Sequence, residues 1–299
     1  MKPRAPAWIA LSAALFLSPA GTAGIPPDSA RGGPFRLFPG GLLVAPIPAH
    51  HPESRLGLRK ETGSSRMRLD VACTMDILEY TPDEGEEGAF RFGIDFGVHA
   101  LTTSSQGFRL QVDAADGLFG GHLSALVPGT GGAAALRLRV AHLSGHFVDG
   151  HYDETTRSWK GGRDPLPFTR DFGELVTLYR TGPRPPAPVL WGGFGYAALV
   201  RPDRMGRTEY ACGAYTHIPL AEGRVLGSAA WLYAAYALTL RGVPAYRGTH
   251  RMEGGLKLGD PGGPGLRLWT GWQTGLDDLA QYFDAPASSW GVGFSFEPL

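Results

Sequence analysis

The chain has 299 residues, of which 43% are hydrophobic and 44 are glycine, and its 28 basic and 28 acidic residues cancel at neutral pH. This balance excludes a nucleic-acid partner held by a basic surface. No run after the N-terminal region is long and apolar enough for a membrane-spanning helix, which leaves a periplasmic or secreted protein, or a β-barrel.

The N-terminal residues predict export. Lys2 and Arg4 precede an apolar run from Ala7 to Leu17, and small residues follow up to Ala23. This order is typical of a secretory signal peptide, which we place at residues 1–23, with cleavage after Ala20 as the alternative. Residues 24–54, rich in proline and glycine, predict an irregular periplasmic lead-in. A single outer-membrane barrel domain is expected over residues 55–299.

Apolar and polar residues alternate from Met67 onwards, which predicts strands with one apolar and one charged face. In the segment 136–146, for example, Leu138 and Val140 share one face while Arg137 and Arg139 share the other. Twelve strands are predicted, at 67–80, 89–103, 107–115, 121–128, 134–148, 170–181, 188–200, 208–219, 224–240, 249–258, 265–276 and 288–297.

The strands are long and their polar faces carry both signs of charge, whereas a soluble β-sandwich turns its polar face to bulk water. Aromatic residues near the strand ends predict interfacial girdles. They are Trp191, Tyr196, Tyr210, Tyr215, Trp269, Trp272, Trp290, Phe294 and Phe296. We therefore predict an all-β fold, a transmembrane antiparallel up-and-down β-barrel of about 12 strands in the outer membrane of a Gram-negative cell.

The connections between the predicted strands divide into two sets. If the N-terminus is periplasmic, short Gly- or Pro-rich connections such as 104–107 and 129–132 fall on the periplasmic side. Longer, more charged connections such as 81–88 and 149–167 fall on the outer side, as in outer-membrane barrels.

Charged residues on the polar face are expected to project into the lumen, where charges of both signs must pair or stay hydrated. The residues so assigned are Arg68, Asp70, Arg91, Asp95, Arg109, Arg137 and Arg139. Mixed charge argues against a strongly ion-selective pore. The sequence favours a structural or channel-type, porin-like barrel without enzymatic activity, and it leaves open whether the lumen conducts.

Three segments carry a resemblance to a known family: 37–46, 137–149 and the region from Gln281 to Phe294. Together they resemble the bacterial outer-membrane barrels classed as domain of unknown function 1207 (DUF1207). The resemblance implies outer-membrane location and a barrel fold, and it implies no reaction. This chain departs from the family pattern after His146, where Phe147-Val148-Asp149-Gly150 stands in place of Leu-Gly-Asp-Glu.

His142 and Ser144 fall on the apolar side of their strand, and the pair resembles the outer-membrane phospholipase A family. That family uses a lipid-facing serine, activated by a histidine that an asparagine holds. This chain contains no asparagine, so an acid such as Asp149 would have to orient the base. The alternative function is therefore a serine-type lipid hydrolase using His142, Ser144 and Asp149. A second pair, His122-Leu-Ser124, lowers the specificity of the motif, and simple hydrogen bonding at the headgroup level is the interpretation we favour.

No metal or cofactor is expected. The cluster of His146, Asp149, His151, Asp153 and Glu154 could bind a divalent cation, but solvated loop charges explain it better. Cys73 and Cys212 lie on distant predicted strands and are expected to be unpaired thiols. The expected partners are outer-membrane lipid and the barrel assembly machinery.

Overall fold

The structure is a computed structural model that describes residues 34–82, 89–105, 108–127, 130, 133–225 and 227–297, without the side chains of 105, 108, 109 and 221–224. The predicted signal peptide, residues 1–23, lies outside the described residues, as does the first part of the lead-in. Within the described part of the chain, no helix is long and apolar enough to cross a membrane.

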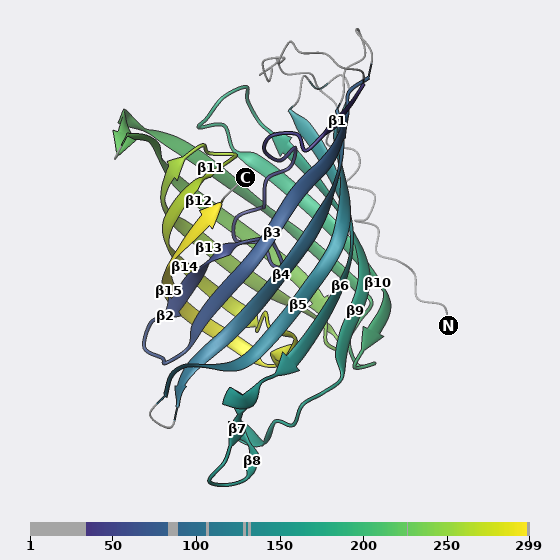
Figure 1. Cartoon of the computed structure of the whole chain (residues 1–299), viewed down its shortest axis with the longest axis vertical. Helices are drawn as coiled ribbons and strands as arrows, with labels where there is room; N and C mark the ends of the chain where they lie inside the picture. The colour runs from purple at the N-terminus through teal and green to yellow at the C-terminus, as the bar shows by residue number, and fades with distance from the viewer. Residues whose placement is uncertain are drawn as a thin grey trace.

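Twelve antiparallel strands close into a barrel, which confirms the predicted fold class (Figure 1). Each strand pairs with its neighbours in chain order, and the pairing of β15 with β2 closes the sheet. The barrel strands are β2 (Leu56–Glu61), β3 (Met67–Tyr80), β4 (Phe90–Ser105), β5 (Phe108–Leu126), β6 (Ala134–Phe147), β9 (Phe168–Arg180), β10 (Val189–Arg201), β11 (Thr208–Val225), β12 (Ser228–Gly242), β13 (Tyr246–Gly259), β14 (Gly265–Leu276) and β15 (Pro286–Glu297).

The predicted strands 107–115 and 121–128 are one continuous strand, β5. The pairing of β5 with β4 shifts between Val112 and Ala114, which leaves Asp113 as an extra residue. Such a bulge reverses the face on which later residues lie, so the alternation breaks without the strand ending. The unpredicted strand β2 restores the total of twelve.

With the strands as observed, two connections lie at the ends of the barrel opposite to those predicted. We call the end where β2 begins and β15 finishes the terminal end, and the opposite one the loop end. The strands flanking connection 81–88 meet at the terminal end, and those flanking 104–107 meet at the loop end, so the predicted placement of both connections was wrong. Connection 149–167 lies at the loop end.

Short strands and 3-10 helices lie at both ends of the barrel (Figure 1). At the terminal end, β1 (Phe35–Leu37) pairs with the last residues of β3. At the loop end, the connection after β6 contains four of them: η2 (Asp149–His151), β7 (Tyr152–Asp153), β8 (Ser158–Trp159) and η3 (Lys160–Gly162). The connection between β14 and β15 contains η4 (Ala280–Tyr282).

The second half of the lead-in folds into the barrel instead of preceding it. Residues 42–54, which we call the plug, include several nearly inaccessible side chains, such as Ile47 at 1% exposure and Glu53 at 6%. The predicted irregular backbone is present here, but a location outside the barrel is wrong for this part of the chain. Packing against the inner wall explains the burial.

Three of the predicted girdle aromatics are also placed differently. Trp191 and Trp269 are buried on the inner face, and Tyr215 packs beside Trp191. Tyr196 and Trp290 are exposed on the outer face as predicted. The inner wall is apolar near Trp191 because the plug packs there. Both faces of β10 therefore carry apolar residues, and the alternation of apolar and polar residues no longer distinguishes the inner face from the outer face.

Candidate functional site

The structure places six of the predicted luminal charges on the inner face of the barrel. They are Arg68, Asp70, Arg91, Asp95, Arg137 and Arg139. The side chain of Arg109 lies outside the described residues. Charges buried in a lumen need partners. The ion pairs described below therefore help to position the two segments that lie inside the barrel.

The plug is held by a buried carboxylate between two buried guanidinium groups. Arg137 Nη1 donates to Glu53 Oε2 over 3.0 Å, and Arg137 Nη2 pairs with Oε1. Arg139 Nη2 lies 3.6 Å from Glu53 Oε1 and 2.6 Å from Glu174 Oε2 on β9. Both arginine side chains are 1% exposed. Glu53 therefore supplies a charge that the barrel wall needs.

The plug also makes apolar contacts with the barrel wall. Val44, Ile47 and Ala49 pack on a patch of the inner wall formed by Val176, Leu178, Trp191, Ala235 and Ala237. A backbone contact adds a further anchor, since the Leu43 N–H donates to Asp76 Oδ2 over 2.9 Å. The plug is thus fixed by hydrophobic burial and by ion pairing together.

A second segment packs against the inner wall at the loop end. The connection 277–285, which we call the cap loop, turns inward, and Phe283 is fully buried in an apolar cluster with wall residues. The Ala280 N–H donates to Asp116 Oδ2 over 2.9 Å, and Gln281 Nε2 donates to the Gly145 carbonyl over 2.7 Å. Gly145 is required at this contact because a Cβ there would collide with Ala280.

Asp284 ties the cap loop to two neighbouring connections. Its carboxylate lies 2.7 Å from Arg163 Nη1 and 2.9 Å from Arg204 Nη2. Partial burial alone would raise the pKa of Asp284, but Arg163 and Arg204 outweigh burial and hold the pKa below its ordinary value. Three separate connections therefore meet at one carboxylate at the loop end.

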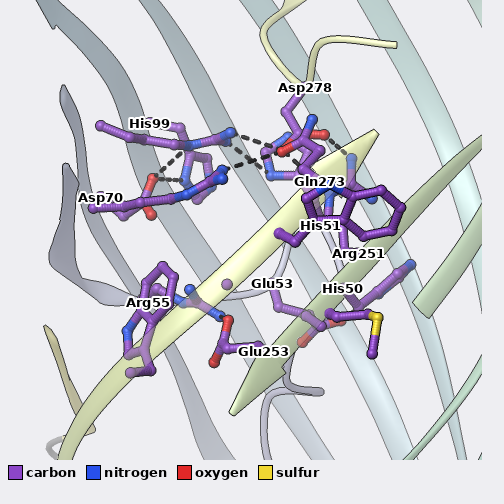
Figure 2. Close-up of a pocket in the computed structure, with 17 residues that line it drawn as sticks. His50, His51, Glu53, Arg55, Asp70, His99, Arg251, Glu253, Gln273 and Asp278 are labelled. Carbon is purple, nitrogen blue, oxygen red and sulfur yellow. Dashed lines mark hydrogen bonds and ion pairs between the residues drawn. The ribbon is translucent and has the colours of Figure 1, made fainter. Parts of the chain in front are cut away.

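A polar cavity of about 60 Å³ is lined by the plug, the cap loop and the inner wall (Figure 2). Its walls contain ion pairs, including Arg55 with Glu253 at 2.9 Å and Asp70 with His99 at 2.8 Å. The lining also includes five side chains that can donate hydrogen bonds: His51, Arg59, Arg68, Arg251 and Trp269. The cavity is small, is lined largely by charged and polar side chains, and is bordered by both inner segments.

His142 and Ser144 lie on the outer face of β6, the face that carries Leu138 and Val140. The carboxylate that meets His142 comes from β9: Asp171 Oδ1 lies 2.6 Å from His142 Nδ1. Asp171 stands directly opposite His142 in the strand register. A histidine paired with a carboxylate therefore lies on the outer surface, with a serine two residues further along the strand. Among the described residues, His142 and Ser144 share no hydrogen bond.

Asp149 does not reach His142. It begins η2, and its Oδ1 accepts a hydrogen bond from the Gly150 N–H over 2.9 Å. The expectation that Asp149 contacts His142 is therefore wrong, and the acid in contact with His142 is Asp171. The sequence offered no signal for this pairing, because the register between β6 and β9 is set across a long connection.

The second His-x-Ser pair faces the lumen, since His122 and Ser124 are 3% and 1% exposed. His122 bridges two carboxylates, with Nε2 2.8 Å from Asp76 and Nδ1 3.0 Å from Asp95. The bulge at Asp113 explains why this pair faces inward. Of the two His-x-Ser pairs, His142 and Ser144 therefore face the outside of the barrel, and His122 and Ser124 face its lumen.

The acidic and histidine residues after β6 are spread apart. His151 is buried, stacked on Phe147 at 3.6 Å between ring centroids and hydrogen-bonded to Asp113, while Asp153 accepts from the Thr155 N–H. Within the described chain, no three His, Cys, Asp or Glu side chains form a metal-binding group. Cys73 and Cys212 are exposed and unpaired.

Comparisons with known proteins return outer-membrane barrels among solved structures. The β domain of the Bordetella autotransporter BrkA is 12% identical, with a TM-score of 0.41 over 81% of this chain and 96% of that chain. OmpT of Vibrio cholerae, expressed in the outer membrane, is 12% identical, with a TM-score of 0.39 over 81% and 95%. Its in-vitro folded trimer form gives 13% and 0.38 over 81% and 96%. No family model and no curated protein matches the chain.

Proposed function

We propose that this protein is an outer-membrane β-barrel of the channel type whose lumen is kept closed by its own plug and cap loop. The observation that carries the proposal is the pairing of Glu53 with Arg137 and Arg139, because it joins the plug to the barrel wall through buried charges that one substitution weakens. A barrel that served only as a scaffold would not need a segment held inside its lumen by buried charges.

The outer surface supports the membrane location. Large apolar side chains are exposed on outward positions around the barrel, with Phe96 and Val140 both 63% exposed. Soluble monomers rarely expose a continuous apolar belt of this extent, whereas membrane barrels require one. In this proposal outer-membrane lipid contacts the belt, the barrel assembly machinery inserts the chain, and membership of the DUF1207 barrels rests on the three segments quoted above.

Conductance in planar bilayers tests the closed-channel proposal. The wild-type protein should show no stepwise conductance, and Glu53→Gln should produce discrete openings, because it removes the plug carboxylate that pairs with Arg137 and Arg139 and leaves Arg139 only the Pro52 carbonyl on the plug. Glu61→Gln is the matched control, since Glu61 pairs with Arg66 at the loop end and does not touch the plug. Steady large conductance in the wild type, or silence in a folded Glu53→Gln variant, would contradict the proposal.

A second candidate, lipid acyl hydrolysis, is favoured by the pairing of His142 with Asp171 on the outer face. In this reaction Ser144 Oγ would bond to the ester carbonyl carbon while His142 Nε2 takes its proton. The alcohol would leave with that proton, and water would then release the fatty acid. Asp171 would hold the ring in the required orientation.

Release of fatty acid from phospholipid micelles tests this candidate. Ser144→Ala should abolish release, and Asp171→Asn should lower the rate about 100-fold. Ser124→Ala serves as the control because Ser124 belongs to the same motif but faces the lumen. Fatty-acid release that persists in Ser144→Ala would show that Ser144 and His142 do not catalyse the reaction.

A further inference from the structure

The polar cavity contains more hydrogen-bond donors than the protein itself satisfies. Four buried donor atoms lining it have no partner within the described residues: His51 Nε2, Arg59 Nε, Arg251 Nη1 and Trp269 Nε1. His51, Arg251 and Trp269 are each more than nine-tenths buried. Leaving several buried donors unpaired costs free energy, so such a site calls for an acceptor.

His51 can be assigned as a donor from its neighbour. Arg68 Nη2 lies 3.0 Å from His51 Nδ1, and a guanidinium group can only donate. Nδ1 must therefore accept, and the ring proton sits on Nε2. The unpaired atom of His51 is thus an N–H, like the unpaired atoms of Arg251 and Trp269.

Charge in the cavity points in the same direction. Arg55 pairs with Glu253, while Arg68 and Arg251 share Asp278, and Arg68 also contacts Asp70. Glu53 also borders the cavity, but it is committed to Arg137 and Arg139. The cavity therefore holds four guanidinium groups against three available carboxylates.

Arg59 is the uncompensated cation. Its guanidinium donates to neutral acceptors, namely Gln273 Oε1 at 3.2 Å and Ser289 Oγ at 3.0 Å. Among the described residues, no carboxylate lies within ion-pair distance of it. An anion in the cavity would balance this charge and accept from its unpaired Nε.

We propose that this cavity binds a small monovalent oxyanion, either a carboxylate or a phosphate monoanion. Arg59 Nε and Arg251 Nη1 each offer one charged donor, and the Trp269 and His51 N–H groups supply neutral donors, so the separate oxygens of one oxyanion can accept from them. The cavity volume limits the ligand to a compact group, such as acetate or inorganic phosphate.

Titration of the purified full-length barrel with acetate and, separately, with inorganic phosphate tests the site. Each anion is added both during refolding and afterwards, because the plug and the cap loop restrict entry. Saturable binding is expected by calorimetry. The anion that binds more tightly identifies the preferred oxyanion class.

Arg59→Gln is the diagnostic variant because it removes a charge without stranding a carboxylate. Binding should weaken about tenfold or more, as expected for a lost charge-assisted hydrogen bond. Trp269→Phe keeps the ring, removes one donor and should weaken binding by a smaller factor. Arg36→Gln, which removes an equally positive group at an exposed pair with Glu79, should leave binding unchanged.

Two results would overturn the site. One is the absence of saturable binding of either anion under both loading conditions, which would leave water as the partner of the donors. The other is equal affinity in folded Arg59→Gln and wild type. Neither result depends on conductance, so the site and the closed-channel proposal stand or fall separately.

Discussion

At the scale of single residues, Glu53 is the side chain whose loss we expect to affect the plug most. It is the carboxylate that joins the plug to Arg137 and Arg139, which are both almost fully buried. Removing one partner of a buried ion pair typically costs about 3–5 kcal/mol, since the remaining charge loses its compensation. Here Glu174 still faces Arg139, which places the expected cost at the lower end.

We predict that Glu53→Gln loosens the plug before it unfolds the barrel. A cysteine introduced at Ala49, in a background where Cys73 and Cys212 are replaced by serine, should react with a maleimide much faster when Glu53 is also replaced. Ala49 is 5% exposed in the closed state, so labelling reports release directly. Equal labelling rates with and without the Glu53→Gln substitution would show that apolar packing alone retains the plug.

At the scale of elements, alternation identified most of the strands because one face of each meets the lumen and the other faces outward. It failed where the inner face stops being polar. Trp191 faces inward to pack beside His50 of the plug, and the bulge at Asp113 exchanges the faces of β5. The plug leaves no local signal because its position depends on strands far away in sequence, and the bulge leaves none because it is set by the register of β5 against β4.

The cap loop provides a pH-dependent prediction at this scale. The pKa of Asp284 is lowered by Arg163 and Arg204, so the folded protein binds a proton at Asp284 less readily than the unfolded chain does. The stabilisation is therefore present above the pKa of an unfolded Asp, about 4, and is lost as the pH falls through the lower folded value.

Asp284→Asn should remove this dependence while costing only about 1 kcal/mol, because the pairs are partly exposed. Limited proteolysis between pH 7 and pH 3 measures the effect as increased cleavage near the cap loop at low pH in the wild type. The variant should show the increased cleavage at every pH. Asp203→Asn, at an exposed pair with Arg201, is the control. A wild-type cleavage rate independent of pH would contradict the assigned role of Asp284.

At the scale of the whole molecule, the barrel was predictable and the segments packed inside it were not. The antiparallel barrel and its inward charges follow from periodicity and composition, whereas the strand total agreed only because the division of β5 offset the missed β2. The segments that fill the lumen are proline- and glycine-rich or loop-like, and their positions are fixed by Arg137, Asp116 and other groups far away in sequence. The pairing of His142 with Asp171 is likewise a product of strand register.

The apolar belt yields the prediction that tests the membrane assignment most directly. Phe96 lies on the outer face within β4, paired with Cys73 and Phe119 on its two neighbours. If lipid surrounds this position, Phe96→Arg should destabilise the barrel by about 2–4 kcal/mol near the bilayer midplane. Unfolding by guanidinium chloride in phospholipid vesicles measures the difference. Thr155→Arg, on the exposed connection after β7, should change stability by less than about 0.5 kcal/mol. An equally small effect at Phe96 would mean that this face meets water, and the barrel would then have to be a soluble one.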